Sequence, residues 1–231
     1  MRRASALLLA ALAALSALTS RAAFGEAPAS GADAEIASIR AALRTGDVDG
    51  AVALAEKAAK DDPKSSNLAL WLGRAYGQKA RKASILTQLS WAKKCKGAFE
   101  RAVLLDPANL DARSDLISYL VNAPGLAGGD RDEARRQADE IRTRDAVRGH
   151  LAWGFIFEAD KDLPKAEAEY RSAAGSDGAE AAVRARAFWH LGLLLEKQGK
   201  TEDARAALRE AVRLDPTHHR AKRELERLEK G

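Results

Sequence analysis

The sequence has little of what small folds use to cross-link or fill their cores. Cys95 is its only cysteine, so neither an intramolecular disulfide nor a metal site with two cysteine ligands can form. Aromatic residues make up 5% of the chain, which excludes a core built mainly from large rings. Hydrophobic residues still reach 46%, many of them alanine. This composition favours closely packed helices.

Groups of residues that catalyse reactions or bind metals are also missing. The adjacent His218 and His219 would point about 100° apart on a helix, and no His-x3-His or Glu-x2-His spacing occurs. A Gly-x-Ser-x-Gly turn is absent. The glycine-rich run at 123–129 leads into Asp130 and lacks the Gly-Lys-Ser/Thr of a phosphate-binding loop. We therefore expect no catalytic residue, no metal, no cofactor and no enzymatic activity.

An excess of positive charge is small once the N-terminus is set aside. The formal charge is +5, and removing Arg2, Arg3 and Arg21 lowers it to +2. Domains that bind nucleic acid normally carry a clearer excess of basic residues, so the overall charge gives no support for a nucleic-acid partner, and we do not expect one. Charged residues make up 31% of the chain, which suits solvated outer faces.

Residues 1–22 have the pattern of a secretory signal peptide. A basic start precedes the apolar run Ala4–Leu18, and Ser20-Arg21-Ala22 is a small-x-small cleavage motif, with cleavage after Ala22 or Ala23. No second long apolar run follows, so the mature chain should have no transmembrane span. We expect a periplasmic or secreted protein with a flexible lead-in at 23–31. An uncleaved signal that acts as an anchor is the alternative.

The most regular stretch runs from Phe188 to Pro216 and predicts a helical hairpin. Small and apolar residues recur every three or four positions on each side of Gly199, as on helices with one buried face. Counted from Gly192, further markers lie at +12, +16, +19 and +24. The same offsets occur after Gly154, and Ile39 lies 34 residues before the matching Gly73. Such a period indicates a solenoid of helix pairs.

The best copies of this pattern are Leu72-Gly73-x-x-Tyr76, Trp153-Gly154-x-x-Phe157 and Leu191-Gly192-x-x-Leu195, with Leu-Asp-Pro at 105–107 and 214–216. Over roughly residues 32–230 the pattern resembles the tetratricopeptide repeat. The resemblance implies an all-α, right-handed superhelical solenoid of about five helix pairs plus a C-terminal capping helix. It also implies a concave groove that binds a protein or peptide.

The repeat boundaries follow from the marker spacing. We expect one solenoid domain over 32–231, with helix pairs at 32–65, 66–107, 108–143, 144–178 and 181–216 and a cap at 217–230.

The second pair departs from the pattern because it needs ten extra residues. An apolar stripe that starts at Ile85 continues to Ala102, so we expect an extended second helix from about Ala83 to Leu105. No acid occurs from Gln78 to Phe99. The basic residues in this interval are Lys79, Arg81, Lys82, Lys93, Lys94 and Lys96. They form either a solvated face or a docking patch for an anionic lipid surface, cell-wall polymer or nucleic acid.

The resemblance places the first helix of each pair on the concave side. It therefore implies groove positions next to each marker and one turn away, Leu70 among them. The partner-binding residues that we predict are Arg40, Arg74, Gln78, Ser118, Asn122, Phe155, Glu158, Trp189 and Leu193. A peptide with an acidic portion and an apolar portion would complement them. An ordinary packing role remains open for each.

Overall fold

The computed structural model describes residues 31–230, which fold into α helices and one short 3-10 helix with no β-strand among them. The expected signal peptide at 1–22, the lead-in up to residue 30 and Gly231 lie outside the described residues. The helices are α1 (Gly31–Thr45), α2 (Val48–Asp61), α3 (Ser66–Lys82), α4 (Ile85–Leu105), α5 (Leu110–Asn122), η1 (Gly125–Ala127), α6 (Arg131–Arg144), α7 (Ala146–Ala159), α8 (Leu163–Ala174), α9 (Ala181–Lys197), α10 (Thr201–Leu214) and α11 (His219–Lys230).

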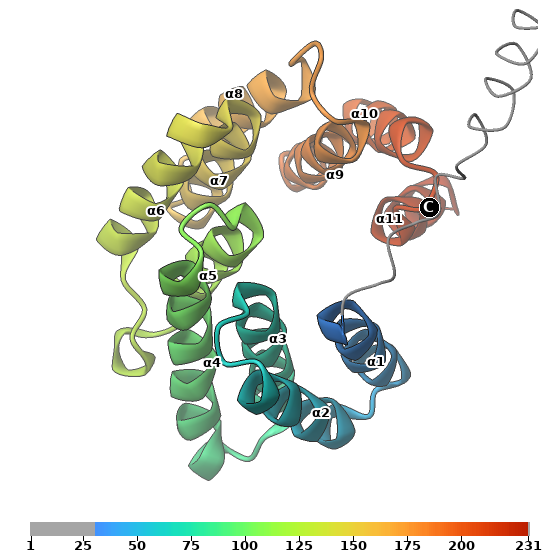
Figure 1. The fold of residues 1–231 in the computed structure, drawn as a ribbon. Coiled ribbons are helices and arrows are strands. Elements are labelled where there is room, and N and C mark those ends of the chain that lie inside the picture. The colour runs from blue at the N-terminus through green and yellow to red at the C-terminus, as the bar shows by residue number, and fades with distance from the viewer. Residues whose placement is uncertain (1–30, 231) are drawn as a thin grey trace, which may run out of the picture.

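Consecutive helices pack in pairs that stack into a curved solenoid (Figure 1). Each odd-numbered helix from α1 to α7 also contacts the next odd-numbered helix. In Figure 1 these helices lie on the inner side of the curve, while α2, α4, α6, α8 and α10 lie on its outer side. The all-α solenoid predicted from the repeats is therefore confirmed, with α11 following the last pair.

Side-chain caps begin many of the helices. Asp130, for example, accepts hydrogen bonds from the main-chain N–H groups of Asp132 and Glu133 at 3.0 and 2.9 Å. Such a cap satisfies donors that have no partner within the helix and contributes about 1 kcal/mol. Asp47, Ser65, Asn109, Asp145 and Asp162 cap α2, α3, α5, α7 and α8 in the same way.

The marker glycines lie where paired helices approach most closely. A Cβ atom on Gly154 would come within 2.5 Å of the Tyr170 ring, which is closer than real Cβ contacts allow. Gly73 meets Phe99 and Gly192 meets Leu208 in the same way. Glycine in the first helix thus makes room for a large residue of the second, which explains the +16 offset found in the sequence.

The buried side chains form two clusters that meet at α7. The first extends from Ile39 on α1 to Ile156 on α7, and the second from Leu151 on α7 to Leu228 on α11. Alanine makes up much of both clusters, as the composition implied. We refer to the parts of the solenoid around these clusters as the N-terminal half and the C-terminal half.

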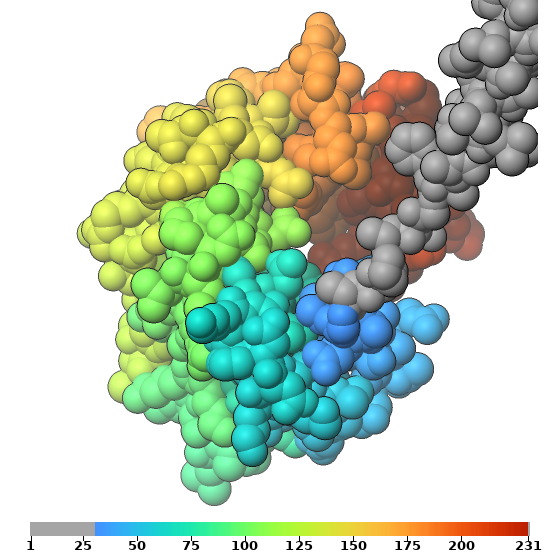
Figure 2. All heavy atoms as spheres, viewed as in Figure 1, coloured from blue at the N-terminus to red at the C-terminus, as the bar shows by residue number. Residues whose placement is uncertain are grey.

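The long second pair is helical as expected, but its tip is not packed. Ile85 is 86% exposed and Leu86 is 89% exposed, so the prediction that Ile85 belongs to the buried stripe is wrong. The reason is length: α4 has 21 residues, whereas α5 and α6 have 13 and 14 and do not cover its first turns. The start of α4 protrudes at the lower edge of Figure 2.

Deeper along α4 the packing is regular. Trp91 is half-buried and lies 5.7 Å from the Tyr76 ring, although its position falls off the expected stripe. Cys95 lies on the apolar stripe of α4 and is 3% exposed. Burial raises the pKa of its thiol to about 12, so the thiol is protonated at neutral pH.

Candidate functional site on the concave face

The N-terminal end of the concave face is organised around Trp71 on α3. The guanidinium of Arg74 lies 4.5 Å from the ring centre, and that of Arg40, from α1, lies at 5.6 Å. Arg74 Nε also donates to Asp115 Oδ2 on α5 at 2.6 Å. Cation–π and ionic contacts therefore join α1, α3 and α5 along the inner side.

Arg148 on α7 continues this series in the middle of the face. Its Nη1 donates to Asp111 Oδ1 on α5 at 2.8 Å, and its Nη2 lies 3.8 Å from Glu180 Oε2 at the start of α9. Asp145 adds a contact at 3.3 Å. The charge of this arginine is thus matched by carboxylates, and the pairs link three successive inner helices.

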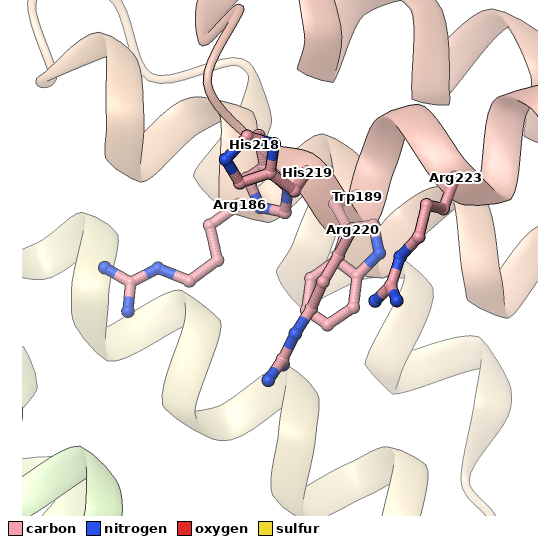
Figure 3. Close-up of a pocket in the computed structure, with 6 residues that line it drawn as sticks. All are labelled: Arg186, Trp189, His218, His219, Arg220 and Arg223. Carbon is pink, nitrogen blue, oxygen red and sulfur yellow. The ribbon is translucent and has the colours of Figure 1, made fainter. Parts of the chain in front are cut away.

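The C-terminal end is organised around Trp189 on α9. His190 and His218 lie 4.5 and 5.4 Å from its ring, and the guanidinium of Arg220 on α11 lies at 5.6 Å. Figure 3 shows that Arg220 and Arg223 extend beside the indole while Arg186 reaches away over a neighbouring helix. Helix α11 therefore forms one wall of this end.

Each tryptophan lines a hollow. The Trp71 hollow has a volume of about 400 Å³ and is lined by Ala37, Arg40, Ala41, Leu43, Arg44 and Trp71. The Trp189 hollow has a volume of about 590 Å³ and is lined by Arg186, Trp189, His218, His219, Arg220 and Arg223. No carboxylate lines either hollow among the described residues, so the charged side chains of both linings are all basic.

Arginines supply this charge in the Trp189 hollow at neutral pH. Burial, and then the neighbouring Arg148, lowers the pKa of Arg186, but a guanidinium stays protonated in proteins. Burial lowers the pKa of His190 to about 4 and also lowers the pKa of His218. Both imidazoles are therefore mainly neutral at pH 7.

The structure brings two of the predicted groove residues, Arg40 and Trp189, into the hollows, and places a third, Arg74, over the Trp71 ring. By helical spacing, Gln78 shares the face of Arg74, Ser118 and Asn122 that of Asp115, Phe155 that of Arg148, and Leu193 that of Arg186. Asn122 Nδ2 donates to the Ser118 carbonyl at 2.8 Å. The roles of these residues in binding stay predictions.

Glu158 does not offer a free carboxylate to the groove. Its Oε2 accepts a hydrogen bond from the Tyr170 hydroxyl at 3.0 Å, and Lys197 Nζ pairs with its Oε1. These contacts join α7 and α8 of one helix pair to α9 of the next. Instead of the predicted Glu158, the C-terminal hollow presents three arginines beside Trp189.

Sequence reasoning missed several residues of the hollows. It placed Leu70 in the groove, but Leu70 is 3% exposed and its neighbour Trp71 takes the inner position. It also treated the last helix only as a cap. The missed residues are Trp71, Arg44, Arg186, Arg220 and Arg223. A tryptophan with arginines three or four residues away, as in Arg186 and Trp189, was the available signal.

The predicted basic patch is partly engaged within the fold. Lys79 pairs with Asp49, Lys96 Nζ lies 3.3 Å from Glu100 Oε1, and Lys82 Nζ donates to the Gly46 carbonyl at 2.9 Å. Lys94 Nζ lies 4.4 Å from the centre of the Trp91 ring. Arg81 and Lys93 are exposed and make no hydrogen bond or ion pair with the described residues.

Metal and membrane sites are not found in the part of the chain that the structure describes. Residues 31–230 contain no cluster of three His, Cys, Asp or Glu side chains that could hold a metal ion. Within the same range no helix combines the length and apolarity that crossing a bilayer requires.

Fold and site together define a helical-repeat solenoid with an open, polar concave face. Two stretches of the chain, residues 36–83 and 185–218, match family models described as tetratricopeptide repeat. Both stretches are therefore similar to the tetratricopeptide repeat, as the resemblance implied. No curated protein matches it in sequence.

Solved structures agree on the fold. TTC0263, a thermophilic TPR protein of Thermus thermophilus, is 16% identical and has a TM-score of 0.62, covering 85% of this chain and 98% of that chain. The type IV pilus biogenesis factor PilW is 17% identical, with a TM-score of 0.54 over 79% of this chain and 77% of that chain. PilF of Pseudomonas aeruginosa is 16% identical, with a TM-score of 0.53 over 82% and 79%. Repeats of this kind serve as protein-binding scaffolds and are usually non-catalytic.

Proposed function

We propose that this protein is an exported, non-catalytic scaffold that holds a segment of a partner polypeptide on its concave face. The observation that supports this proposal is the difference between the buried and the exposed faces of the helix pairs. The interfaces between packed helices bury small and apolar side chains, whereas the inner face keeps tryptophan, arginine, serine and amide groups accessible. An extended polypeptide could contact several inner helices at once, so affinity would come from many modest contacts.

Affinity capture with a groove variant tests the binding face. Arg40→Glu with Arg223→Glu reverses two exposed charges that make no ion pair within residues 31–230, so the fold should be kept. Lys60→Glu with Arg213→Glu makes the same charge change on the outer helices α2 and α10 and serves as the control. We expect the wild type and the control to recover the same partner and the groove variant to lose it. Equal recovery by all three would reject the concave face as the binding site.

Export is a separate part of the proposal and rests on the signal pattern at 1–22. N-terminal sequencing of the full chain, produced with a C-terminal tag, tests it. We expect a mature N-terminus at Ala23 or Phe24 in the envelope fraction. An intact Met1 in the cytosolic fraction would contradict export, and an intact Met1 in the membrane fraction would support the anchor alternative.

A second candidate function is docking on an anionic lipid surface through the tip of the long hairpin. The exposed Ile85 and Leu86 favour it, because two neighbouring aliphatic side chains in water beside the basic Arg81 match the apolar and anionic layers of a membrane surface. We expect the protein to sediment with vesicles of phosphatidylglycerol and phosphatidylcholine at low salt.

Ile85→Ser with Leu86→Ser should weaken this sedimentation at least about fivefold, because burying each aliphatic side chain contributes roughly 1.5 kcal/mol or more. Leu126→Ser, at a residue 78% exposed elsewhere, is the matched control and should have no effect. Equal sedimentation of all variants would exclude the hairpin tip as the membrane contact. No sedimentation of the wild type would exclude the lipid surface and leave cell-wall polymer or nucleic acid as anionic partners of the basic patch.

A further inference from the structure

The arginines of this protein differ in whether they have a hydrogen-bond or ion-pair partner within the fold. Within residues 31–230 most arginines pair with a carboxylate, and Arg101 and Arg184 instead donate to the main-chain carbonyls of Pro63 and Ala174. Apart from Arg81, the arginines with neither a carboxylate nor a carbonyl partner line the two hollows. They are Arg40, Arg44, Arg186, Arg220 and Arg223. Guanidinium groups without an anion gather on the face that is open to a partner.

The Trp189 hollow also contains an unused neutral donor. The indole Nε1–H of Trp189 is buried and has no hydrogen-bond partner among the described residues. A buried donor without a partner costs about 1–3 kcal/mol, so a ligand that accepts from it gains a matching advantage. In Figure 3 the indole nitrogen lies on the side of the ring along which Arg223 extends, where the nitrogen is covered in the absence of a ligand.

We infer that the Trp189 hollow binds the side-chain carboxylates of an acidic stretch of the partner polypeptide. This inference rests on the proposed function and names the chemistry that this end of the groove recognises. Arg220 and Arg223 provide planar, two-pronged donors that fit carboxylates, and the indole N–H provides a further donor. The face of the indole packs against the methylene groups of the bound side chains.

The size of the hollow favours a stretch of acids over a single one. At about 590 Å³ it is far larger than one carboxylate. Arg186 lies closer to the middle of the face, within the electrostatic influence of Asp111, Asp115 and Glu180, which reduces its attraction for a further anion. Arg220 and Arg223, on α11, are the principal charges of the site.

The four tryptophans report on four separate places. Trp71 and Trp189 lie in the two hollows, Trp91 lies beside Lys94 on the basic patch, and Trp153 Nε1 donates to Asp139 at 3.0 Å between α7 and α6. Their indole N–H signals in a ¹H–¹⁵N spectrum, assigned by single Trp→Phe changes, therefore locate a ligand. The probe is a peptide of four glutamates with blocked ends, and its four-glutamine equivalent is the control.

We expect the glutamate peptide to shift the Trp189 signal and the glutamine peptide to leave it in place. Arg220→Gln with Arg223→Gln should weaken glutamate-peptide binding at least about tenfold, since two charge-assisted contacts are lost. Arg213→Gln removes an exposed arginine that pairs with Glu210 on α10, and it should leave binding unchanged.

Other outcomes separate the inference from the proposed function. A shift at Trp71 alone, or unchanged binding by the double variant, would overturn the inference while the groove remained a binding face. Shifts confined to Trp91 would count against both, because the peptide would then bind the basic patch. No binding of the glutamate peptide would overturn the inference alone, and the capture experiment would decide the proposed function.

Discussion

The two ends of the concave face use the same side chains in different states. At the N-terminal end, Arg74 packs on Trp71 and is held by Asp115 at 2.6 Å. At the C-terminal end, Arg220 packs beside Trp189, but no carboxylate holds it among the described residues. The indole N–H of Trp189 is also unused. At one end the arginine that packs on the indole is held within the fold, although Arg40 and Arg44 in the same hollow have no carboxylate partner among the described residues. The other end leaves all of these donors to a ligand.

This difference indicates that the Trp71 end mainly orders the repeats and the Trp189 end mainly recognises the partner. An arginine already paired with a carboxylate has less attraction left for another anion. The two halves differ in a second respect, because every histidine of the described chain lies at or after His150. The C-terminal half therefore responds to pH in a range where the N-terminal half does not.

The largest expected effect comes from removing a buried ring between two paired helices of one half. Tyr170→Ala removes a fully buried ring that packs against Gly154, and should cost about 3–5 kcal/mol of unfolding free energy. Since the two halves have separate clusters of buried residues, the Trp189 signal should change at a lower urea concentration than the Trp71 signal. Phe99→Ala, in the N-terminal half, should reverse that order. Simultaneous loss of both signals in both variants would show that the halves unfold as one unit.

Acid should weaken the C-terminal half next. Burial lowers the pKa of His190 to about 4 from an ordinary 6.5, so the unfolded chain binds this proton more readily than the folded chain. Stability is therefore fully present above about pH 6.5 and falls toward pH 4, by about 2 kcal/mol between pH 7.5 and pH 5. Urea unfolding at the two pH values measures this change. In His190→Gln the same interval should cost clearly less, and an unchanged slope would assign the effect to other groups.

A smaller effect should follow from making the N-terminal end resemble the C-terminal one. Asp115→Asn keeps the shape of the side chain and removes the charge that holds Arg74. The glutamate peptide should then shift the Trp71 signal with an affinity about two- to fivefold higher than in the wild type, because a freed arginine–carboxylate contact contributes roughly 0.5–1 kcal/mol at a half-exposed site. Asp49→Asn, which frees Lys79 away from the hollow, is the control. A gain of the same size in that control would point to overall charge rather than to Arg74.

The smallest effect should come from the basic patch. Arg81→Gln with Lys93→Gln removes two exposed charges that lie outside both hollows. Binding of the glutamate peptide at 0.15 M salt should change less than about twofold, since exposed charges beyond a Debye length of about 8 Å are screened. A larger loss would show that the groove and the patch act together.

The interfaces between paired helices could be predicted from the sequence because they depend on contacts that repeat. Gly73, Gly154 and Gly192 each admit one large residue of the partner helix, and an Asp-Pro pair follows α2, α4 and α10, although α6 and α8 end without one. The offsets therefore predicted a solenoid of helix pairs, and the continuing apolar stripe predicted a helical insert at Ala83–Leu105. The insert begins at Ile85, because Ser84 adopts the extended conformation that precedes the helix.

The concave face was harder to predict because one step along a helix turns a side chain by about 100°. Leu70 and Trp71 are neighbours, yet one is buried in the core and the other lines a hollow. Contacts between repeats, such as the approach of Arg220 on α11 to Trp189 on α9, depend on how far the solenoid turns at each step. A single sequence does not specify that rotation. The partners of Glu158 were missed for the same reason.

The arginine–carboxylate links along the inner helices also bear on the mechanics of the solenoid. Arg74–Asp115 and Arg148–Asp111 each join one repeat to the next on the side where curvature brings the helices together. Because such partly exposed pairs weaken as salt rises, the solenoid should become easier to deform and less tightly curved at high ionic strength.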